Sequence, residues 1–211
     1  MKSINIGICG LGTIGAGTFN LIDQNSTIIT QRTGREIRVI QVSDLIDNPA
    51  CDLSSVDLSR DIFEVARNPQ VDILVELIGG TTTALKLILS AIENNKHVVT
   101  ANKALIAQHG REIFAAAEQK GVMVAYEASI GGGIPIVKAL REGLAANRVQ
   151  WIAGIINGTS NYILTEMEEK QRDFADVLSE AQQLGYAEAD PTFDIEGIDA
   201  AHKLTILSSI A

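Results

Sequence analysis

Three glycines close to the start of the chain, in the pattern Gly10-x-Gly12-x-x-Gly15, restrict its fold more than any other feature of the sequence. They follow an apolar run at 4–8 whose alternation predicts a β-strand, and they precede residues 16–30, where apolar side chains recur at helical spacing. In this context the first glycine permits a tight turn, the second lets the backbone approach a pyrophosphate, and the third lets the helix pack on the strand. The pattern therefore predicts a dinucleotide-binding loop and disfavours the alternative, a glycine-rich turn without a ligand.

Further candidates for nucleotide contacts lie at the start of this helix and after the second predicted strand. Backbone N–H groups of Thr13 and Ile14, together with the helix dipole, favour an anionic group. Asp44 is a candidate for the ribose 2′-hydroxyl, although it stands 34 residues after Gly10 and a turn-capping role is equally open. Residues 43–48 include Asp47 but no arginine or lysine. A 2′-phosphate would meet negative charge there, which slightly favours NAD over NADP.

Strand-like and helix-like segments alternate through the first 130 residues. Continuous apolar strands that alternate with helices predict a parallel sheet covered on both faces, which is the doubly wound α/β, or Rossmann-type, fold. Gly121 suits a left-handed residue that ends a helix. The expected strands are 4–8, 37–42, 71–78, 97–100 and 122–126, and the expected helices are 16–30, 60–67, 84–94 and 104–120.

A second domain is expected after the glycine-rich run at 128–135, which ends at Pro135. We place a dinucleotide-binding domain at 1–130 and, at 131–211, the beginning of an α+β substrate and dimerisation domain. Its last helix stops without a cap or a polar tail, so we expect the chain to be truncated and this domain to be incomplete. The expected elements are helices at 136–146, 160–170, 173–184 and 197–210, a strand at 149–156 and an acidic loop at 186–196.

Composition excludes several functional classes. The net charge of −9 disfavours binding to nucleic acid, because phosphate backbones are repelled. No apolar run approaches the ~18 residues of a membrane span, and the first residues lack the features of a signal peptide, so we expect a cytoplasmic protein. Cys9 and Cys51 stand in no CxxC spacing, and the three histidines have no metal-ligand spacing. We expect buried or free thiols and non-catalytic histidines.

Two lysines stand out by their positions. Lys103 follows the fourth predicted strand at the start of a helix, where a cation is electrostatically disfavoured, so a role toward a ligand is favoured over a solvated lysine. Lys203 and Asp199 share one helical face, and by spacing alone an exposed ion pair worth ~0.3–0.5 kcal/mol is the simplest interpretation. The preceding loop is dense in carboxylates, an arrangement that suggests binding of a cation or an amino group. These are Glu188, Asp190, Asp194 and Glu196.

Several motifs together resemble homoserine dehydrogenase along essentially the whole chain. The most specific is the run at 184–203, with Gly185, Asp190-Pro191, Asp194-Ile195, Gly197, Asp199 and Lys203. The others are GLGTIG (10–15), VDILVELIGG (71–80), VVTANKALIA (98–107), YEASIGGGIP (126–135) and GIINGTSNYI (154–163). The resemblance implies interconversion of L-homoserine and L-aspartate 4-semialdehyde with NAD or NADP, on the route to threonine, methionine and isoleucine.

The resemblance also implies roles for individual residues. Lys203 corresponds to the general acid/base, Asp199 to its acidic companion, and Lys103 to a lysine near the nicotinamide and the substrate. Glu188 corresponds to a carboxylate that binds the substrate amino group, and Gly158 and Thr159 suit the substrate carboxylate. Tyr186 and Asp194 are further substrate candidates, and Thr81 is a further cofactor candidate. A sodium ion would be held by main-chain carbonyls of Glu127, Ile130, Gly132 and Ile134. The family is commonly homodimeric, and many relatives carry arginine where Ser43 stands here.

Two alternatives to this function stay open. Sugar and inositol dehydrogenases share this domain organisation, but they tend to have Glu-Lys-Pro after the fourth strand, where this chain has Ala101-Asn102-Lys103. A non-catalytic dinucleotide-binding fragment is the alternative from a different class. Nucleotide binding without turnover of homoserine would favour the fragment.

Overall fold

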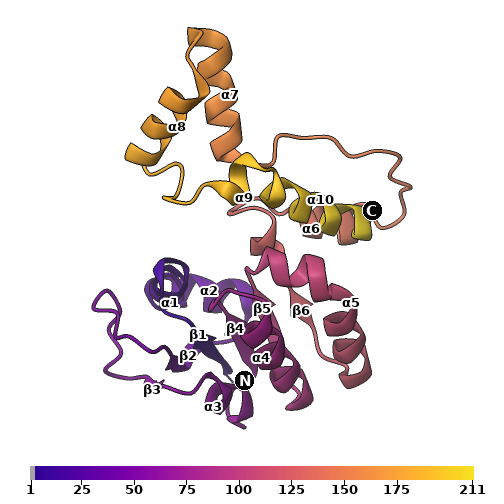
Figure 1. Ribbon diagram of the computed structural model, residues 1–211. Helices are drawn as coiled ribbons and strands as arrows, with labels where there is room; N and C mark the ends of the chain where they lie inside the picture. Colours follow the sequence, from indigo (N-terminus) through magenta and orange to yellow (C-terminus); the bar gives the residue numbers. More distant parts are fainter. Residues whose placement is uncertain (1–2) are drawn as a thin grey trace. The chain divides into compact units, whose positions relative to one another are not determined.

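The computed structural model describes residues 3–211, which divide into two compact units between Ile136 and Val137. The first unit contains a six-stranded sheet in the order β3-β2-β1-β4-β5-β6, with every neighbouring pair parallel (Figure 1). Its strands are β1 (Ile4–Cys9), β2 (Ile37–Ser43), β3 (Asp57–Ser59), β4 (Ile73–Glu76), β5 (His97–Thr100) and β6 (Val124–Ala125). The predicted doubly wound α/β fold is confirmed, and only the short β3 was not expected.

The helices of this unit cover the two faces of the sheet. Right-handed crossovers place α1 and α2 on one face, while α3, α4 and α5 pack side by side on the other. The helix expected over 16–30 is divided at Asn25, and α5 is capped at its C-terminus by Gly121, whose φ of 65° is left-handed as expected. The bounds are α1 (Thr13–Gln24), α2 (Ser26–Thr33), α3 (Ile62–Arg67), α4 (Thr82–Glu93) and α5 (Lys103–Lys120), with a 3₁₀ turn at Glu127–Ser129.

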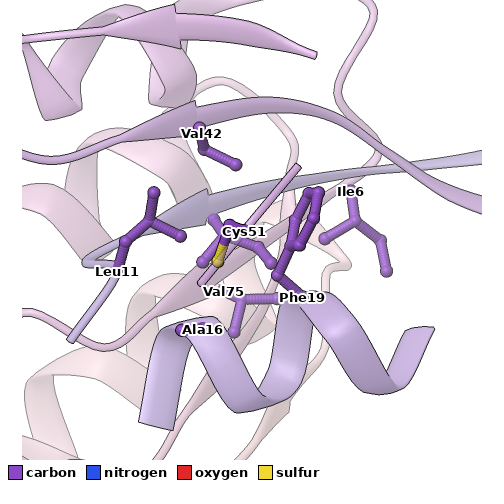
Figure 2. Packing of buried hydrophobic residues seen from close by; sticks show 8 residues of the cluster. Ile6, Leu11, Ala16, Phe19, Val42, Cys51 and Val75 are labelled. Carbon is purple, nitrogen blue, oxygen red and sulfur yellow. The ribbon is translucent and has the colours of Figure 1, made fainter. Parts of the chain in front are cut away.

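The core beneath α1 joins the first strands to the glycine loop. Leu11, from that loop, is buried beside Phe19 of α1, Val42 of β2 and Val75 of β4 (Figure 2). Cys51 belongs to the same cluster, and Cys9 in β1 is fully buried. Burial raises the pKa of the Cys9 thiol, and the nearby Glu76 and Asp61 carboxylates raise it further. This thiol is therefore a poor nucleophile at neutral pH.

The second unit is helical. Its elements are α6 (Ile136–Lys138), which continues as a π-helical turn at Ala139–Gly143, α7 (Gly158–Lys170), α8 (Phe174–Gln183), α9 (Thr192–Ile195) and α10 (Ile198–Ile210). The strand expected over 149–156 was predicted wrongly. This segment forms no β-ladder, because no strand of the second unit lies alongside it to pair with its backbone. Trp151 and Ile155 are about four-fifths exposed there, at 79% and 80%. Within residues 3–211, no helix combines the length and hydropathy that crossing a bilayer requires.

Candidate functional site

The glycine loop between β1 and α1 has the geometry that its spacing predicts. Gly10 has a φ of +97°, and a Cβ there would lie 2.5 Å from the Leu77 carbonyl oxygen. A Cβ on Gly15 would lie 1.9 Å from the Gly10 carbonyl oxygen, whereas one on Gly12 would meet nothing within 4 Å. The outer two glycines are therefore required by packing. Gly12 leaves open the space through which a phosphate would approach, so the loop fits a dinucleotide.

The helix that follows begins without a side-chain cap. Gly12 is the N-cap of α1, and the first helical bond runs from the Ala16 N–H to the Gly12 carbonyl at 2.9 Å. Because the cap of this helix is a glycine, it has no side chain that could accept a hydrogen bond from the N–H groups of Thr13 and Ile14. An uncapped helix start of this kind suits an anionic ligand.

Asp44, which follows β2, holds the glycine loop in place. Its Oδ2 accepts the Leu11 N–H, and its Oδ1 accepts the Ile46 N–H at 3.1 Å. Asn48 donates to the Leu11 carbonyl at 2.6 Å, so both sides of that residue are fixed. Burial acts to raise the pKa of Asp44. The backbone N–H groups and the Arg60 guanidinium outweigh burial and hold the pKa below its usual value. The turn-capping role of Asp44 is present, and a ribose contact stays a prediction.

A cavity of about 530 Å³ lies beside the glycine loop. Its wall includes Gly10, Gly12, Asp44, Arg60, Ile78 and Thr83. It is thus formed at the carboxyl ends of the β1, β2 and β4 strands, where doubly wound sheets bind ligands. Thr83, rather than the predicted Thr81, belongs to this wall. Ser43 also lines it but is fully buried at the end of β2.

Arg60 is a residue that the sequence analysis missed. Its Nη1 donates to the Asp44 carbonyl at 2.8 Å, and its Nη2 lies 2.5 Å from Asp47 Oδ1. Arg60 follows β3, which pairs with β2 so that Ser59 lies opposite Ser43. Arg60 lies outside residues 43–48, the segment considered for an arginine or lysine that would meet a 2′-phosphate. Recognition of the short strand 57–59 would have supplied the signal.

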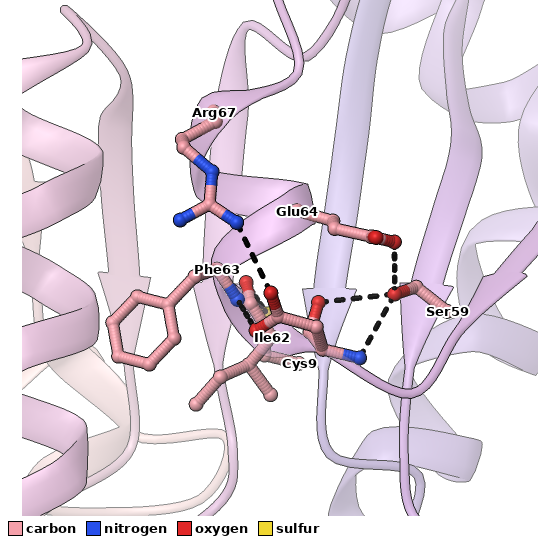
Figure 3. Close-up of polar contacts among 7 residues, drawn as sticks. Cys9, Ser59, Ile62, Phe63, Glu64 and Arg67 are labelled. Atoms are coloured by element: carbon pink, nitrogen blue, oxygen red, sulfur yellow. Dashed lines mark hydrogen bonds and ion pairs between the residues drawn. The ribbon is translucent and has the colours of Figure 1, made fainter.

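The wall near Arg60 continues into the start of α3. Asp61 caps this helix by accepting the Phe63 N–H at 2.8 Å, and Arg67 Nη2 lies 3.0 Å from its other oxygen (Figure 3). Ser59 Oγ donates to Glu64 at 2.6 Å and accepts the Asp61 N–H at 3.0 Å (Figure 3). These contacts fix the turn from β3 into α3 and therefore the position from which Arg60 extends.

A buried carboxylate organises the ends of β4 and β5. Glu76 is fully buried and accepts the Ile78 and Gly79 N–H groups at 3.0 and 3.2 Å and the Thr100 hydroxyl at 2.6 Å. Thr100 Oγ1 in turn accepts the Asn102 N–H at 3.0 Å. The loop after β4 is thereby tied to the loop after β5.

Asn102 links this hydrogen-bond network to the start of α5, where Lys103 lies. Its Nδ2 donates to the Gly80 carbonyl at 2.6 Å, and its Oδ1 caps α5 by accepting the Leu105 N–H at 3.1 Å. Lys103, the first residue of α5, therefore starts from a backbone that is fixed on both sides. Thr81 is the N-cap of α4 and makes no side-chain capping bond.

In the second unit, Lys203 lies in a largely buried polar cluster. Its Nζ is 2.8 Å from Asp199 Oδ2 and donates to the Ile156 carbonyl at 2.8 Å. The side chains are only 17% and 4% exposed, so the simple exposed ion pair considered from the spacing was wrong. The Ile156 carbonyl and the Asn157 side chain contact this pair from a segment more than 40 residues away, which sequence spacing cannot show.

Asn157 links this ion pair to the acidic loop. Its Nδ2 lies 2.7 Å from Asp194 Oδ1 and 3.0 Å from Asp199 Oδ2, and its Oδ1 caps α7 by accepting the Ser160 N–H at 2.7 Å. Asp194 is therefore brought next to the Lys203 cluster. The sequence analysis missed Asn157, although its place before the helix start is typical of an N-cap.

The other residues predicted to bind the substrate lie at the start of α7 and in the loop after α8, and they differ in their contacts. Thr159 is buried, and its hydroxyl donates to the Tyr186 carbonyl at 2.7 Å. Tyr186 is half-exposed and packs edge-on against Tyr162. Gly158 begins α7, and Glu188 is exposed in the loop after α8. Thr159 thus joins the start of α7 to the acidic loop.

The residues predicted to hold sodium lie in and after the 3₁₀ turn of the first unit. The Glu127 carbonyl accepts the Ile130 N–H at 3.1 Å, and the Ile134 carbonyl accepts the Ile136 N–H at 2.9 Å. The Glu127 carbonyl also accepts the Gly131 N–H at 3.4 Å, so both of its lone pairs are engaged, whereas the Ile134 carbonyl keeps a second lone pair for a cation. Over residues 3–211, His, Cys, Asp and Glu side chains form no cluster of three or more that suits a metal ion.

Comparison with known families assigns both units. A family model described as the NAD-binding domain of homoserine dehydrogenase matches residues 10–127, and one described as homoserine dehydrogenase matches residues 135–211. The homoserine dehydrogenase of Pseudomonas aeruginosa is 64% identical over 211 residues, which is 100% of this chain and 49% of that protein. That of Bacillus subtilis is 41% identical over 100% of this chain and 49% of its own length.

Solved structures agree with these matches. A homoserine dehydrogenase from Thiobacillus denitrificans is 60% identical, with a TM-score of 0.93 over 99% of this chain and 49% of that one. A hyperthermophilic archaeal homoserine dehydrogenase in complex with NADPH is 27% identical, with a TM-score of 0.85 over 99% of this chain and 70% of that one. This chain spans about half the length of the curated relatives it matches.

Proposed function

The chain belongs to the homoserine dehydrogenase family, as its motifs indicated, and from this premise we propose that the protein interconverts L-homoserine and L-aspartate 4-semialdehyde with NAD or NADP. This reaction would serve the synthesis of threonine, methionine and isoleucine. The observation that carries the proposal is the enclosed Lys203–Asp199 pair, with its amine held in place by the Ile156 carbonyl. An amine fixed in this way is equipped for proton transfer to a substrate alcohol.

In the first unit, the proposed cofactor contacts follow from the loop geometry. The open side of Gly12 and the helix start at Thr13 and Ile14 would receive the pyrophosphate, and the 530 Å³ cavity would receive the adenosine. When bound, the nicotinamide supplies a hydride acceptor or donor. Lys103 is proposed to lie near its ring and near the substrate, on the backbone that Glu76 and Asn102 hold.

In the second unit, Lys203 is proposed as the general acid/base. Asp199 and the Ile156 carbonyl engage two positions on Nζ, so one remains for the substrate oxygen. There the neutral amine would take the hydroxyl proton during oxidation, and the ammonium would return it during reduction. Asp199, whose Oδ2 lies 2.8 Å from Nζ, is proposed to orient the Lys203 amine. Glu188 is proposed to bind the substrate amino group and Thr159 with Gly158 the carboxylate, while Tyr186 and Asp194 border the same region.

Three further features belong to the same proposal. A sodium ion would be held by the carbonyls of Glu127, Ile130, Gly132 and Ile134, and melting in sodium against caesium chloride would test this. The protein is proposed to work as a cytoplasmic homodimer. Sedimentation of the protein at its natural length would measure the oligomeric state.

The test of the reaction is oxidation of L-homoserine by NAD⁺ or NADP⁺, followed by the absorbance of the reduced cofactor in the protein at its natural length. Lys203→Ala should lower kcat by ~10²–10⁴, because general acid/base catalysis contributes that much, and should leave cofactor affinity unchanged. Lys170→Ala is the control, because Lys170 is exposed and its amine pairs with Glu166, one turn away on α7. Near-normal turnover of Lys203→Ala would remove Lys203 from the mechanism. Cofactor binding without any turnover of homoserine would favour a non-catalytic nucleotide-binding protein.

A further inference from the structure

Arg60 lines the cavity that is proposed to receive the adenosine, and its ion-pair partner Asp47 stands outside the cavity wall. Arg60 lines the cavity together with Asp44, and its Nη2 lies 2.5 Å from Asp47 Oδ1. Its Nη1 donates to the Asp44 carbonyl at 2.8 Å. The guanidinium is therefore held on two sides by the turn that follows β2.

The charges around this turn leave no excess of positive charge for a phosphate. Arg60 faces both Asp44, whose pKa it helps to lower, and Asp47. The next acid, Asp61, is paired with Arg67 at 3.0 Å. Two arginines and three aspartates therefore lie at this edge, which gives a net charge of −1, and Asp47 engages the Arg60 Nη2 that would otherwise bind an anion.

We propose that Asp47 is a positioning residue that sets cofactor selectivity through Arg60: by engaging the guanidinium it disfavours a 2′-phosphate and favours a nucleotide with a free 2′-hydroxyl. This inference rests on the proposed function, since it requires that the cavity receives the adenosine half of a dinucleotide. It also revises the sequence argument, because an arginine is present at this edge but is already paired.

The physical basis is competition for one cation. A phosphate carries about −1.5 to −2 charges at neutral pH and pairs best with arginine through two parallel N–H bonds. Asp47 must leave Nη2 before such a pair can form, and its carboxylate then remains beside the phosphate. A ribose 2′-hydroxyl brings no charge and can be bound by Asp44 without this displacement.

The experiment compares two probes that differ at the 2′ position, 5′-AMP and 2′,5′-ADP, by calorimetry on the full chain. Asp47→Asn should tighten binding of 2′,5′-ADP relative to 5′-AMP by about 1.5-fold to fivefold, because a partly exposed charge is released from its pair. The gain should shrink at high salt. In Asp47→Asn with Arg60→Gln the gain should vanish, because it requires the released guanidinium.

The control is Asp52→Asn, which makes the same charge change on the same connection. Asp52 accepts the Ser54 N–H, whereas the ion-pair partner of Arg60 is Asp47, so the ratio of the two affinities should not move. An unchanged ratio in Asp47→Asn, or an equal gain when Arg60 is also replaced, overturns the inference while the proposed function stands. Failure of the chain to bind 5′-AMP, NAD⁺ and NADP⁺ alike overturns both.

Discussion

Glu76 shows how a single buried residue fixes the loops after β4 and β5, on which Lys103 is positioned. Its carboxylate accepts three hydrogen bonds that join the loops after β4 and β5. In Glu76→Gln, the amide oxygen can keep the two backbone bonds, but the amide nitrogen is a donor and leaves the Thr100 hydroxyl proton without its acceptor. We expect a loss of ~1–3 kcal/mol in the free energy of unfolding, measured by urea denaturation, because an unsatisfied buried group costs that much.

A matched control separates this network from a general effect of charge. Glu118 lies exposed on α5, and Glu118→Gln should change the free energy of unfolding by less than ~0.5 kcal/mol. Equal stability of the Glu76 and Glu118 variants would show that the bonds of Glu76 are not needed to hold the two loops.

Some site residues could be predicted from the sequence because their chemistry is local. Gly10, Gly12 and Gly15 act through a turn of six residues, and Lys203 with Asp199 act across one helical turn. Arg60 could not be predicted in the same way, because its place depends on the pairing of β3 with β2. The burial of the Lys203 pair likewise depends on the fold of the whole second unit.

At the scale of elements, the segment 149–156 shows that a local preference for β-structure does not form a strand unless a neighbouring strand pairs with it. Its nearly continuous run of apolar residues is typical of a strand, yet a strand is stable only when neighbouring backbone groups complete its hydrogen bonds. The strands of the first unit other than β3 were predicted well because they have parallel neighbours and apolar runs, whereas β3 has only three residues, two of them polar. The boundary at Asn25 and the π-helical turn at 139–143 were missed, since apolar spacing does not mark such irregularities.

Trp151 is the sole tryptophan of the chain and reports directly on this segment. Because its side chain is 79% exposed, we expect its fluorescence to be red-shifted and readily quenched by iodide and acrylamide in the folded 211-residue chain. Free tryptophan amide gives the reference for full exposure. A blue-shifted emission that resists iodide would instead support the strand that the sequence predicts.

At the scale of the whole molecule, the two units differ in how well they are packed. The first contains a closed core of fully buried side chains, among them Ile8, Leu74 and Ile113. The second has no sheet, and many of its large apolar side chains are exposed, including Leu144, Trp151, Ile155, Leu164, Phe174, Phe193 and Leu204. Because burial of apolar area is the main source of stability, we expect amide hydrogens of α7, α8 and α10 to exchange faster than those of β1 and β4.

Nucleotide binding should slow hydrogen exchange in the first unit and leave exchange in the second unit unchanged. NAD⁺ at about a hundredfold excess over its Kd stabilises the unit that binds it by ~2.7 kcal/mol, so exchange in β1, α1 and β4 should slow by about a hundredfold while α8 is unaffected. Gly15→Ala should abolish the effect, because the added Cβ would lie 1.9 Å from the Gly10 carbonyl oxygen. Gly17→Ala is the matched control in the same helix, since a Cβ there meets nothing within 4 Å. Equal slowing in α8 and β1, measured by mass spectrometry, would instead show that the two units open as one cooperative body.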